Sequence, residues 1–197
     1  MRTIRAADAK KVYAHPGTQV ARLERKDLLH RVAFGYYVVV PQDRIGTNWR
    51  PPIEAVAAGI ATAIVGERIP VLMGLTAARI HHALPRALGE ALVAVPKWHR
   101  PIRLSDRDGT IRFVERKTDQ LDAEVVATEL GKCLATTPEQ TVLDLAHRPQ
   151  LGHAEGEAWA AIKALLPRCD HELLVEIATQ QRLRASLVRV ERIGTSR

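Results

Sequence analysis

The chain has 197 residues, of which 46 % are hydrophobic and only 4 % are aromatic. The hydrophobic share is large enough for a folded core, which excludes wholesale disorder, and the scarcity of aromatic residues disfavours stacking on single-stranded nucleic acid. The net charge of +7 lies almost entirely in residues 1–50, which hold 10 Lys+Arg against 4 Asp+Glu. Such a basic segment is suited to the phosphate backbone of DNA.

Two helices separated by a tight turn are predicted near the start of the chain. The first covers residues 6–14 and ends at the Pro16-Gly17 pair, since this pair breaks a helix. Thr18 is a good N-cap for the second helix, which we expect to run to Leu29. The apolar side chains expected to face a core from this second helix are Val20, Leu23 and Leu28.

A two-stranded hairpin is predicted over residues 29–40. The run from Tyr36 to Val40 is rich in aromatic and β-branched residues, as is typical of a strand, and Gly35 can supply the positive φ of a tight turn. The order of helix, turn, helix and hairpin is that of a winged helix-turn-helix. Only a handful of residues precede Ala6, so the first helix of such a domain is short or missing, or part of its core comes from a neighbour.

The second helix carries the long polar side chains that a recognition helix presents to DNA. Gln can pair with adenine and Arg with guanine in the major groove, which assigns base contacts to Gln19 and Arg22. Phosphate contacts position a protein without reading sequence, and they are assigned to the basic residues Lys10, Lys11, Arg25, Lys26 and Arg31. The alternative is that these are ordinary solvated charges, but the turn, the change of period and the hairpin together favour DNA binding.

Residues 41–52 predict a linker to a larger second part, because they are rich in Pro, Gly and Asn. Helices are expected at about residues 52–65, 76–84, 154–166 and 171–189, and strands at residues 92–95, 102–104 and 111–114. Asp108-Gly109 joins the last two strands as a hairpin. Thr76 is an expected N-cap, and the stretch from Thr137 to Gln140 has the spacing of a capping box that opens a further helix.

The fold class that follows is α+β. We expect a winged helix-turn-helix over residues 1–48 and a larger mixed α/β domain over residues 49–197, with a small antiparallel sheet and several helices. Residues 1–11 lack the apolar stretch of a signal peptide, and the apolar run over residues 53–65 is too short to span a bilayer. Together with two cysteines that lack metal-ligand spacing, this predicts a soluble cytoplasmic protein.

Catalysis is the weakest of the functional hypotheses. The sequence has no phosphate-binding loop, no dinucleotide-binding glycine pattern and no HExxH motif, so neither a cofactor nor a bound metal nor an enzyme activity is expected. Asp106 or Asp108 with Glu115 and Lys117 is similar to the acid…Glu-x-Lys pattern of metal-dependent nucleases. The pattern is short, and the two aspartates flank a predicted turn, where acids are common anyway.

Three stretches of the chain resemble the AbiEi family. The hairpin segment over residues 28–38 is similar to the wing of these proteins. Leu75-Thr76-Ala77-Ala78, the strand Val93-Ala94-Val95-Pro96 and the stretch Thr136–Leu145 are similar to their second domain, and the last stretch carries the specific Thr-Pro-Glu-x-Thr-x-x-Asp-Leu pattern. The resemblance extends from about residue 6 to residue 190.

The resemblance implies an antitoxin of a type IV bacterial toxin–antitoxin system. In this family the winged helix binds promoter DNA and represses its own operon, and the C-terminal domain counters a nucleotidyltransferase-like toxin, directly or indirectly. On matched positions it adds Thr18 and Tyr36 to the DNA contacts, although Tyr36 can equally pack the wing on the helices; Thr137, Gln140 and Asp144 are interpreted as structural. The alternatives are a stand-alone winged-helix regulator without a toxin and, last, the nuclease.

Overall fold

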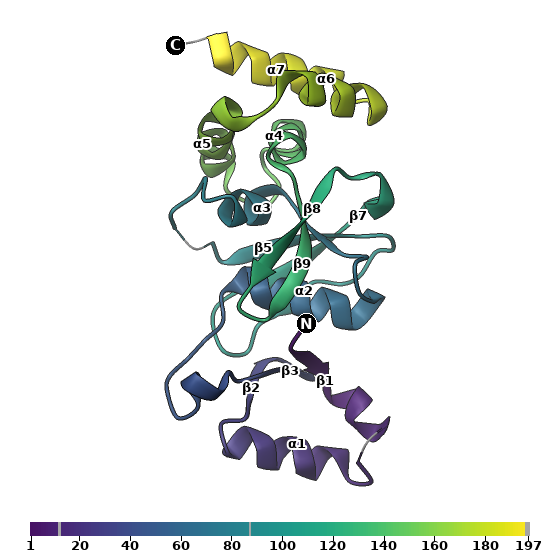
Figure 1. Cartoon of the computed structure of the whole chain (residues 1–197), viewed down its shortest axis with the longest axis vertical. Helices are drawn as coiled ribbons and strands as arrows, with labels where there is room; N and C mark the ends of the chain where they lie inside the picture. Colours follow the sequence, from purple (N-terminus) through teal and green to yellow (C-terminus); the bar gives the residue numbers. More distant parts are fainter. Residues whose placement is uncertain (12, 87, 196–197) are drawn as a thin grey trace.

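The computed structural model describes residues 1–11, 13–86 and 88–195 of an elongated molecule (Figure 1). Among these residues the strands form two sheets. The smaller sheet has the order β1-β3-β2, with β1 over Thr3–Arg5, β2 over Leu29–Ala33 and β3 over Tyr36–Val39. The larger sheet has the order β6-β7-β5-β4-β9-β8 and occupies the middle of the molecule, between the smaller sheet and the C-terminal helices.

The first helices begin and end at other residues than the sequence predicted. The expected helix over residues 6–14 is a 3-10 helix, η1, over Ala6–Lys11, and residue 12 lies outside the described residues. The next helix, α1, covers Pro16–Arg25, so Pro16 opens this helix instead of breaking the chain before it. Proline suits the first helical position because its fixed φ is already helical. The prediction that Thr18 caps this helix was therefore wrong, and His15 is the N-cap residue.

The hairpin prediction is confirmed. Strands β2 and β3 pair antiparallel, with a bulge between Arg31 and Ala33, and Gly35 has a φ of 78° at the turn. Strand β1 adds a third strand that the sequence reasoning missed, and it pairs antiparallel with β3. The smaller sheet therefore has three strands where a two-stranded hairpin was predicted.

The larger sheet is mixed. It comprises β4 (Val71–Leu72), β5 (Glu90–Val95), β6 (Ile102–Arg103), β7 (Thr110–Glu115), β8 (Ala123–Thr128) and β9 (Gly131–Thr136). The pairs β5–β7 and β4–β9 are parallel, and the remaining neighbours are antiparallel. The α+β fold class is confirmed, and so are the three predicted strands. The sheet is larger than expected, since β4, β8 and β9 were not predicted, and it is not purely antiparallel.

The helices of the larger part are α2 (Ile53–Val65), α3 (Gly74–Ile80), α4 (Pro138–His147), α5 (Glu155–Leu165), α6 (His171–Gln180) and α7 (Arg184–Thr195). Three 3-10 turns lie in the connecting segments: η2 (Gln42–Arg44) precedes α2, η3 (Thr118–Gln120) lies between β7 and β8, and η4 (Leu166–Arg168) follows α5. The single helix predicted over residues 171–189 is two helices, because the chain turns at Arg182, whose φ is 58°.

The N-cap predictions had opposite outcomes. The N-cap residue of α3 is Met73 and not Thr76, which lies within the first turn of the helix. The Thr76 hydroxyl accepts a hydrogen bond from the Leu92 backbone N–H at 2.7 Å. Thr137 does cap α4 and accepts the Gln140 backbone N–H at 3.3 Å. The Gln140 side chain completes no capping box, since it bonds to Asp144 and other groups instead.

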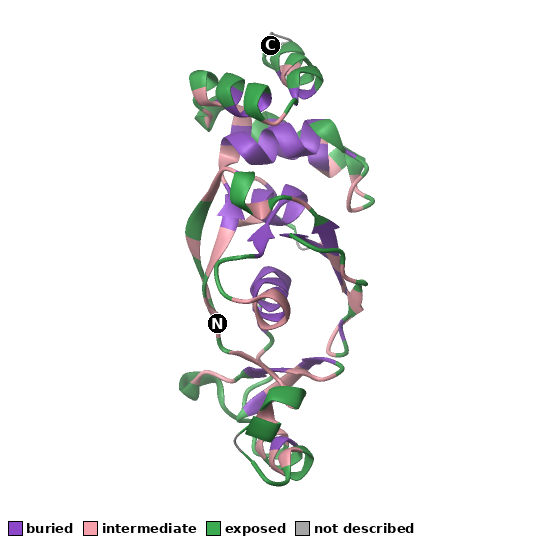
Figure 2. Ribbon diagram, turned by 90° about the vertical axis from the view of Figure 1, so that its right-hand side faces the viewer, coloured by how far each residue is buried: buried purple, intermediate pink, exposed green. Residues whose placement is uncertain are grey.

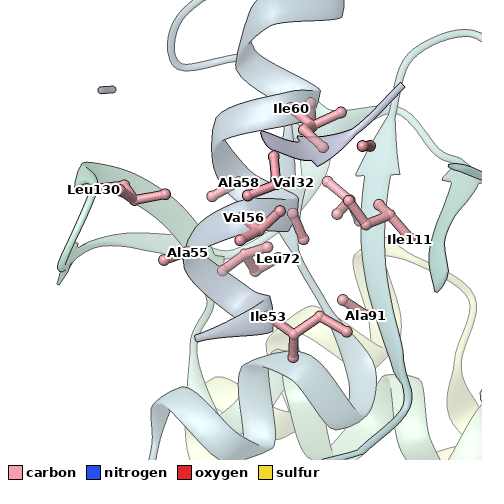
Figure 3. Close-up of a cluster of buried hydrophobic side chains, with 14 of the residues drawn as sticks. Val32, Ile53, Ala55, Val56, Ala58, Ile60, Leu72, Ala91, Ile111 and Leu130 are labelled. Atoms are coloured by element: carbon pink, nitrogen blue, oxygen red, sulfur yellow. The ribbon is translucent and has the colours of Figure 1, made fainter. Parts of the chain in front are cut away.

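Helix α2 lies at the centre of the main hydrophobic core (Figure 2). It is apolar on nearly all sides, as expected of a helix that is buried all round. One side packs on Val32 and Val38 of the smaller sheet, and another packs on residues of the larger sheet such as Leu72 and Ile111 (Figure 3). The opposite face of the smaller sheet packs on α1 through a separate cluster, Val20, Leu29 and Tyr37. A neighbouring segment thus supplies half of the cover of the N-terminal sheet.

The C-terminal helices form a core of their own. Helix α4 is central to it, with Val142, Leu143 and Leu145 packed against α3, α5, α6 and α7. A smaller cluster of Val71, Met73 and Leu92 lies on the face of the larger sheet away from α2. In the described part of the chain no helix is both long enough and apolar enough to cross a membrane.

Candidate nucleic-acid interface

Helix α1 presents a polar face to solvent at one end of the molecule. Its apolar side is anchored by Val20, which is buried, and by Leu23, which packs against the same cluster. Thr18, Arg22 and Arg25 are exposed on the other side, as the helical period requires. Gln19, predicted to share that face, is half-buried at its border. The expectation that Leu28 faces the core was wrong, because the helix ends at Arg25 and Leu28 is 37 % exposed.

The remaining basic residues of the prediction are distributed around α1. Lys10 and Lys11 are exposed on η1, which packs on α1, and Lys11 forms an ion pair with Asp8 at 3.2 Å. Lys26 is exposed at the C-cap of α1. The end of α1, its C-cap and the adjoining η1 therefore carry a set of solvated positive charges, with one acidic partner among them.

The two DNA contacts predicted on the hairpin, Arg31 and Tyr36, have different surroundings. Arg31 is half-buried on β2, and its guanidinium carbon lies 5.5 Å from the centre of the Phe34 ring. Tyr36 is half-buried and packs against the main core, which corresponds to the packing alternative. Phe34, which the sequence reasoning did not single out, is 86 % exposed at the tip of the hairpin. Its position beside Gly35 in the predicted turn was the sequence signal that could have indicated its exposure.

A polar joint connects the hairpin to the larger sheet. His30 Nε2 lies 2.9 Å from Asp106 Oδ2, and Arg107 donates to both oxygens of the same carboxyl group, at 3.1 and 2.7 Å. Burial by itself raises the pKa of Asp106, but the hydrogen bonds from His30 and Arg107 outweigh it and lower the pKa to about 2. The carboxylate is therefore ionised at neutral pH and is engaged on both oxygens.

The stretch Thr136–Leu145 forms a buried polar network at the start of α4. Gln140 Nε2 donates to Asp144 Oδ1 at 3.2 Å and to Gln181 Oε1 at 3.1 Å, and Arg116 donates to the same two acceptor atoms. Burial raises the pKa of Asp144, and the positive charge of Arg116 opposes that rise. These contacts agree with the structural interpretation of Thr137, Gln140 and Asp144, since each bonds to other parts of the same chain.

The residues of the nuclease pattern do not come together as a metal site. Asp106 is engaged with His30 and Arg107, whereas the Asp108 side chain is 98 % exposed and lies 3.6 Å from Arg103. Glu115 and Lys117 are both exposed at the end of β7. Within residues 1–11, 13–86 and 88–195, no three His, Cys, Asp or Glu side chains are grouped so that they could hold a metal ion.

Comparisons with known proteins bear on the family of the second part of the chain and on the fold. The sequence profile described as the AbiEi antitoxin C-terminal domain matches residues 70–193. A comparison with curated proteins finds no match. Among solved structures, the chain is similar to the crystal structure of the RV2827C protein from Mycobacterium tuberculosis, with a TM-score of 0.59 and 16 % identity, over 96 % of this chain and 72 % of that chain. At that identity the likeness concerns the fold alone.

Proposed function

The chain belongs to the AbiEi antitoxin family, and from this premise we propose that it represses its own operon by binding promoter DNA and counters a nucleotidyltransferase-like toxin of a type IV system. The family match covers residues 70–193, so it bears on antitoxicity. DNA binding is assigned to residues 1–48, which lie outside that match, and rests on their own charge and geometry. This activity belongs in the cytoplasm, where the promoter is.

The observation that carries the DNA-binding proposal is the free polar face of α1. Arg22 and Arg25 are solvent-exposed on a helix whose other side is fixed by Val20. A helix held on one side and free on the other can enter the major groove, and Arg can bond to guanine there. Lys10, Lys11 and Lys26 are exposed nearby, and we propose that they contact phosphates. We interpret α1 as the recognition helix and the β2–β3 hairpin as the wing.

The toxin is the second proposed partner, and its support comes from the family alone. The C-terminal helices and the larger sheet form the part of the chain that matches the antitoxin domain. We propose that residues 49–197 are the domain that counters the toxin, directly or indirectly. A gene for a nucleotidyltransferase-like protein next to this one would support the pairing, whereas its absence would favour a stand-alone winged-helix regulator.

A metal-dependent nuclease receives the least support of the three hypotheses. Such an enzyme needs carboxylates that are free to bind a divalent cation. Asp106 is engaged by His30 and Arg107, and Asp108 lies on the surface beside Arg103. We therefore propose a binding protein without a cofactor.

A band-shift titration tests the DNA-binding proposal. The full chain is titrated onto a fragment of its own upstream DNA and onto an unrelated fragment at two salt concentrations, and specific binding that weakens with salt is expected. Arg22→Ala should weaken specific binding by about 1–3 kcal/mol and relax the sequence preference, because it removes a base contact. Lys26→Ala should weaken binding about equally on both fragments, because it removes a phosphate contact.

Arg184→Ala is the matched control. Arg184 is also an exposed helical arginine, but it lies on α7 at the opposite end of the molecule from α1 (Figure 1). Its removal should leave the titration unchanged. If Arg184→Ala weakens binding as much as Arg22→Ala does, the chain binds DNA through its overall charge and α1 is not a recognition helix.

A further inference from the structure

A cavity of about 500 Å³ lies between the segment that follows β7 and the turn that joins α6 to α7. Helices α6 and α7 lie at the opposite end of the molecule from α1 (Figure 1). We call this cavity the α6–α7 cavity. Its polar lining residues are Arg116, Lys117, Gln120, Gln180, Gln181 and Arg182. In the part of the chain that the structure describes, no carboxylate lines it. The acids Asp119, Asp122 and Glu176 line an adjoining depression that shares Gln120, Gln180 and Gln181 with the cavity, so the cations are concentrated on the side formed by Arg116, Lys117 and Arg182.

The walls of this cavity are tied together by hydrogen bonds. Arg116 Nη1 donates to Asp144 Oδ1 at 3.1 Å, and Arg116 Nη2 donates to Gln181 Oε1 at 3.2 Å. Gln181 Nε2 in turn donates to the backbone carbonyl of Gln120 at 3.0 Å. These bonds connect the end of β7, the η3 turn and the α6–α7 turn, which makes the cavity preformed, as small-molecule sites usually are.

Among the described residues, two cations of the cavity form no ion pair. The charge of Arg116 is compensated by the buried Asp144 carboxylate. Lys117 and Arg182, by contrast, have no ion pair and no side-chain hydrogen bond with any described residue, and both are exposed. Lys117 directly follows Arg116 in sequence, so the β7 end of the cavity carries two adjacent cations, of which only Arg116 is paired.

Arg182 is also held in a sparsely populated backbone conformation. Its φ of 58° lies in the left-handed region, as do the φ values of Arg68 and His82. The preceding Gln181 is fixed by three partners, so the turn is determined by its surroundings. This turn therefore holds the backbone of Arg182 at the edge of the cavity.

We propose that the α6–α7 cavity binds the phosphate group of a ligand of nucleotide size, with Lys117 and Arg182 as the cations that contact it. Arg can offer two parallel N–H donors to one phosphate, and Lys contributes a compact charge. The glutamine amides offer both donors and acceptors to the rest of the ligand. The volume lies in the range of small-molecule sites, roughly 300–1,000 Å³. Neither promoter binding through α1 nor membership of the antitoxin family requires this site.

Calorimetric titration of the full chain tests the proposal, with ATP and inorganic tripolyphosphate as probes. The test variants are Lys117→Gln and Arg182→Asn; asparagine is chosen because it tolerates the left-handed conformation. Arg68→Asn is the matched control, since Arg68 is also an exposed arginine, has a φ of 57° and lies outside the cavity. Thermal unfolding of each variant separates a lost contact from a lost fold.

Each test variant is expected to weaken binding of both probes by about tenfold, because each removes a charge-assisted contact to phosphate, and Arg68→Asn to leave binding unchanged. Absence of wild-type binding at millimolar probe, or an equal loss with Arg68→Asn, overturns the proposal. A DNA duplex of unrelated sequence distinguishes the source of the phosphate. If the duplex displaces ATP, the site takes a nucleic-acid backbone; if it does not, the site takes a free nucleotide.

Discussion

At the scale of single residues, Asp106 joins the N-terminal sheet to the rest of the molecule. Its carboxylate bonds to His30 on β2 and to Arg107, and its pKa of about 2 lies below the ordinary value of 3.8. A pKa that is lower in the folded state means that the ionised form stabilises the fold. This stabilisation is fully present above pH 3.8 and is lost as the pH falls through about 2.

Replacing Asp106 should therefore flatten the acid limb of the stability profile. In Asp106→Asn the free energy of unfolding, measured by urea denaturation between neutral pH and pH 2, should be lower than wild type at neutral pH and should converge with it at acid pH. Asp108→Asn is the control, because the Asp108 side chain is 98 % exposed two positions away. Parallel profiles of Asp106→Asn and wild type would mean that this joint contributes nothing.

The role of Asp106 could not be foreseen from local sequence. Its neighbours in the sequence predict a turn, which is correct, and its side chain is a candidate metal ligand there. Its partner His30 is 76 positions away in the chain, and no local pattern reports such a pair. The same holds for Thr76, a plausible N-cap whose hydroxyl is instead used by the Leu92 backbone N–H on β5.

At the scale of elements, the start of α4 shows which local signals hold. Thr137 caps the helix, Pro138 occupies its first turn, and the Thr137 hydroxyl also donates to the Asp122 carboxylate at 2.6 Å. We expect Thr137→Ala to lower the free energy of unfolding by about 1 kcal/mol or somewhat more, because it removes the cap and leaves Asp122 without that donor. Chemical denaturation measures the change.

Thr137→Ser separates the cap from the packing of the threonine methyl group. Serine caps a helix as well as threonine does, so this variant should retain most of the stability. A loss as large as that of Thr137→Ala would assign the effect to the methyl group and remove the cap from the explanation.

Elements were predictable where their signals are local and were missed where they are not. The β2–β3 turn needs a residue with positive φ, and the glycine at position 35 indicates this turn in the sequence. The turn between α6 and α7 has the same requirement but is made by Arg182, so the sequence predicted one continuous helix there. Strands β4 and β1 are only two and three residues long, too short for any periodicity to appear.

At the scale of the whole molecule, α2 makes the two predicted parts depend on each other. It covers Val32 and Val38 of the smaller sheet on one side and residues of the larger sheet on another. A Cβ added at Gly59 of α2 would overlap the side chain of Thr3 on β1, so the two elements approach as closely as glycine permits. The proposed boundary at residue 48 therefore separates segments of sequence whose hydrophobic core is shared.

A fragment of residues 1–48 should fail to fold by itself. Without α2, the face of the smaller sheet that carries Val32 and Val38 is exposed to water, and a small sheet needs a covered hydrophobic face to be stable. We expect no cooperative thermal transition for this fragment by circular dichroism, beside a clear transition for the full chain. A cooperative transition of the fragment would mean that α1 alone suffices to hold the sheet.

The sequence by itself determined the α+β class, the hairpin, the cap of α4, the basic first segment and the family resemblance, because each depends on residues close together in the chain or on composition. Only the tertiary structure decided that α2 completes the N-terminal sheet, that His30 bonds to Asp106, and that Lys117 and Arg182 share one cavity. These features join segments separated by tens of residues. Their partners are selected by packing, which minimises exposed apolar surface over the whole chain and leaves no local pattern.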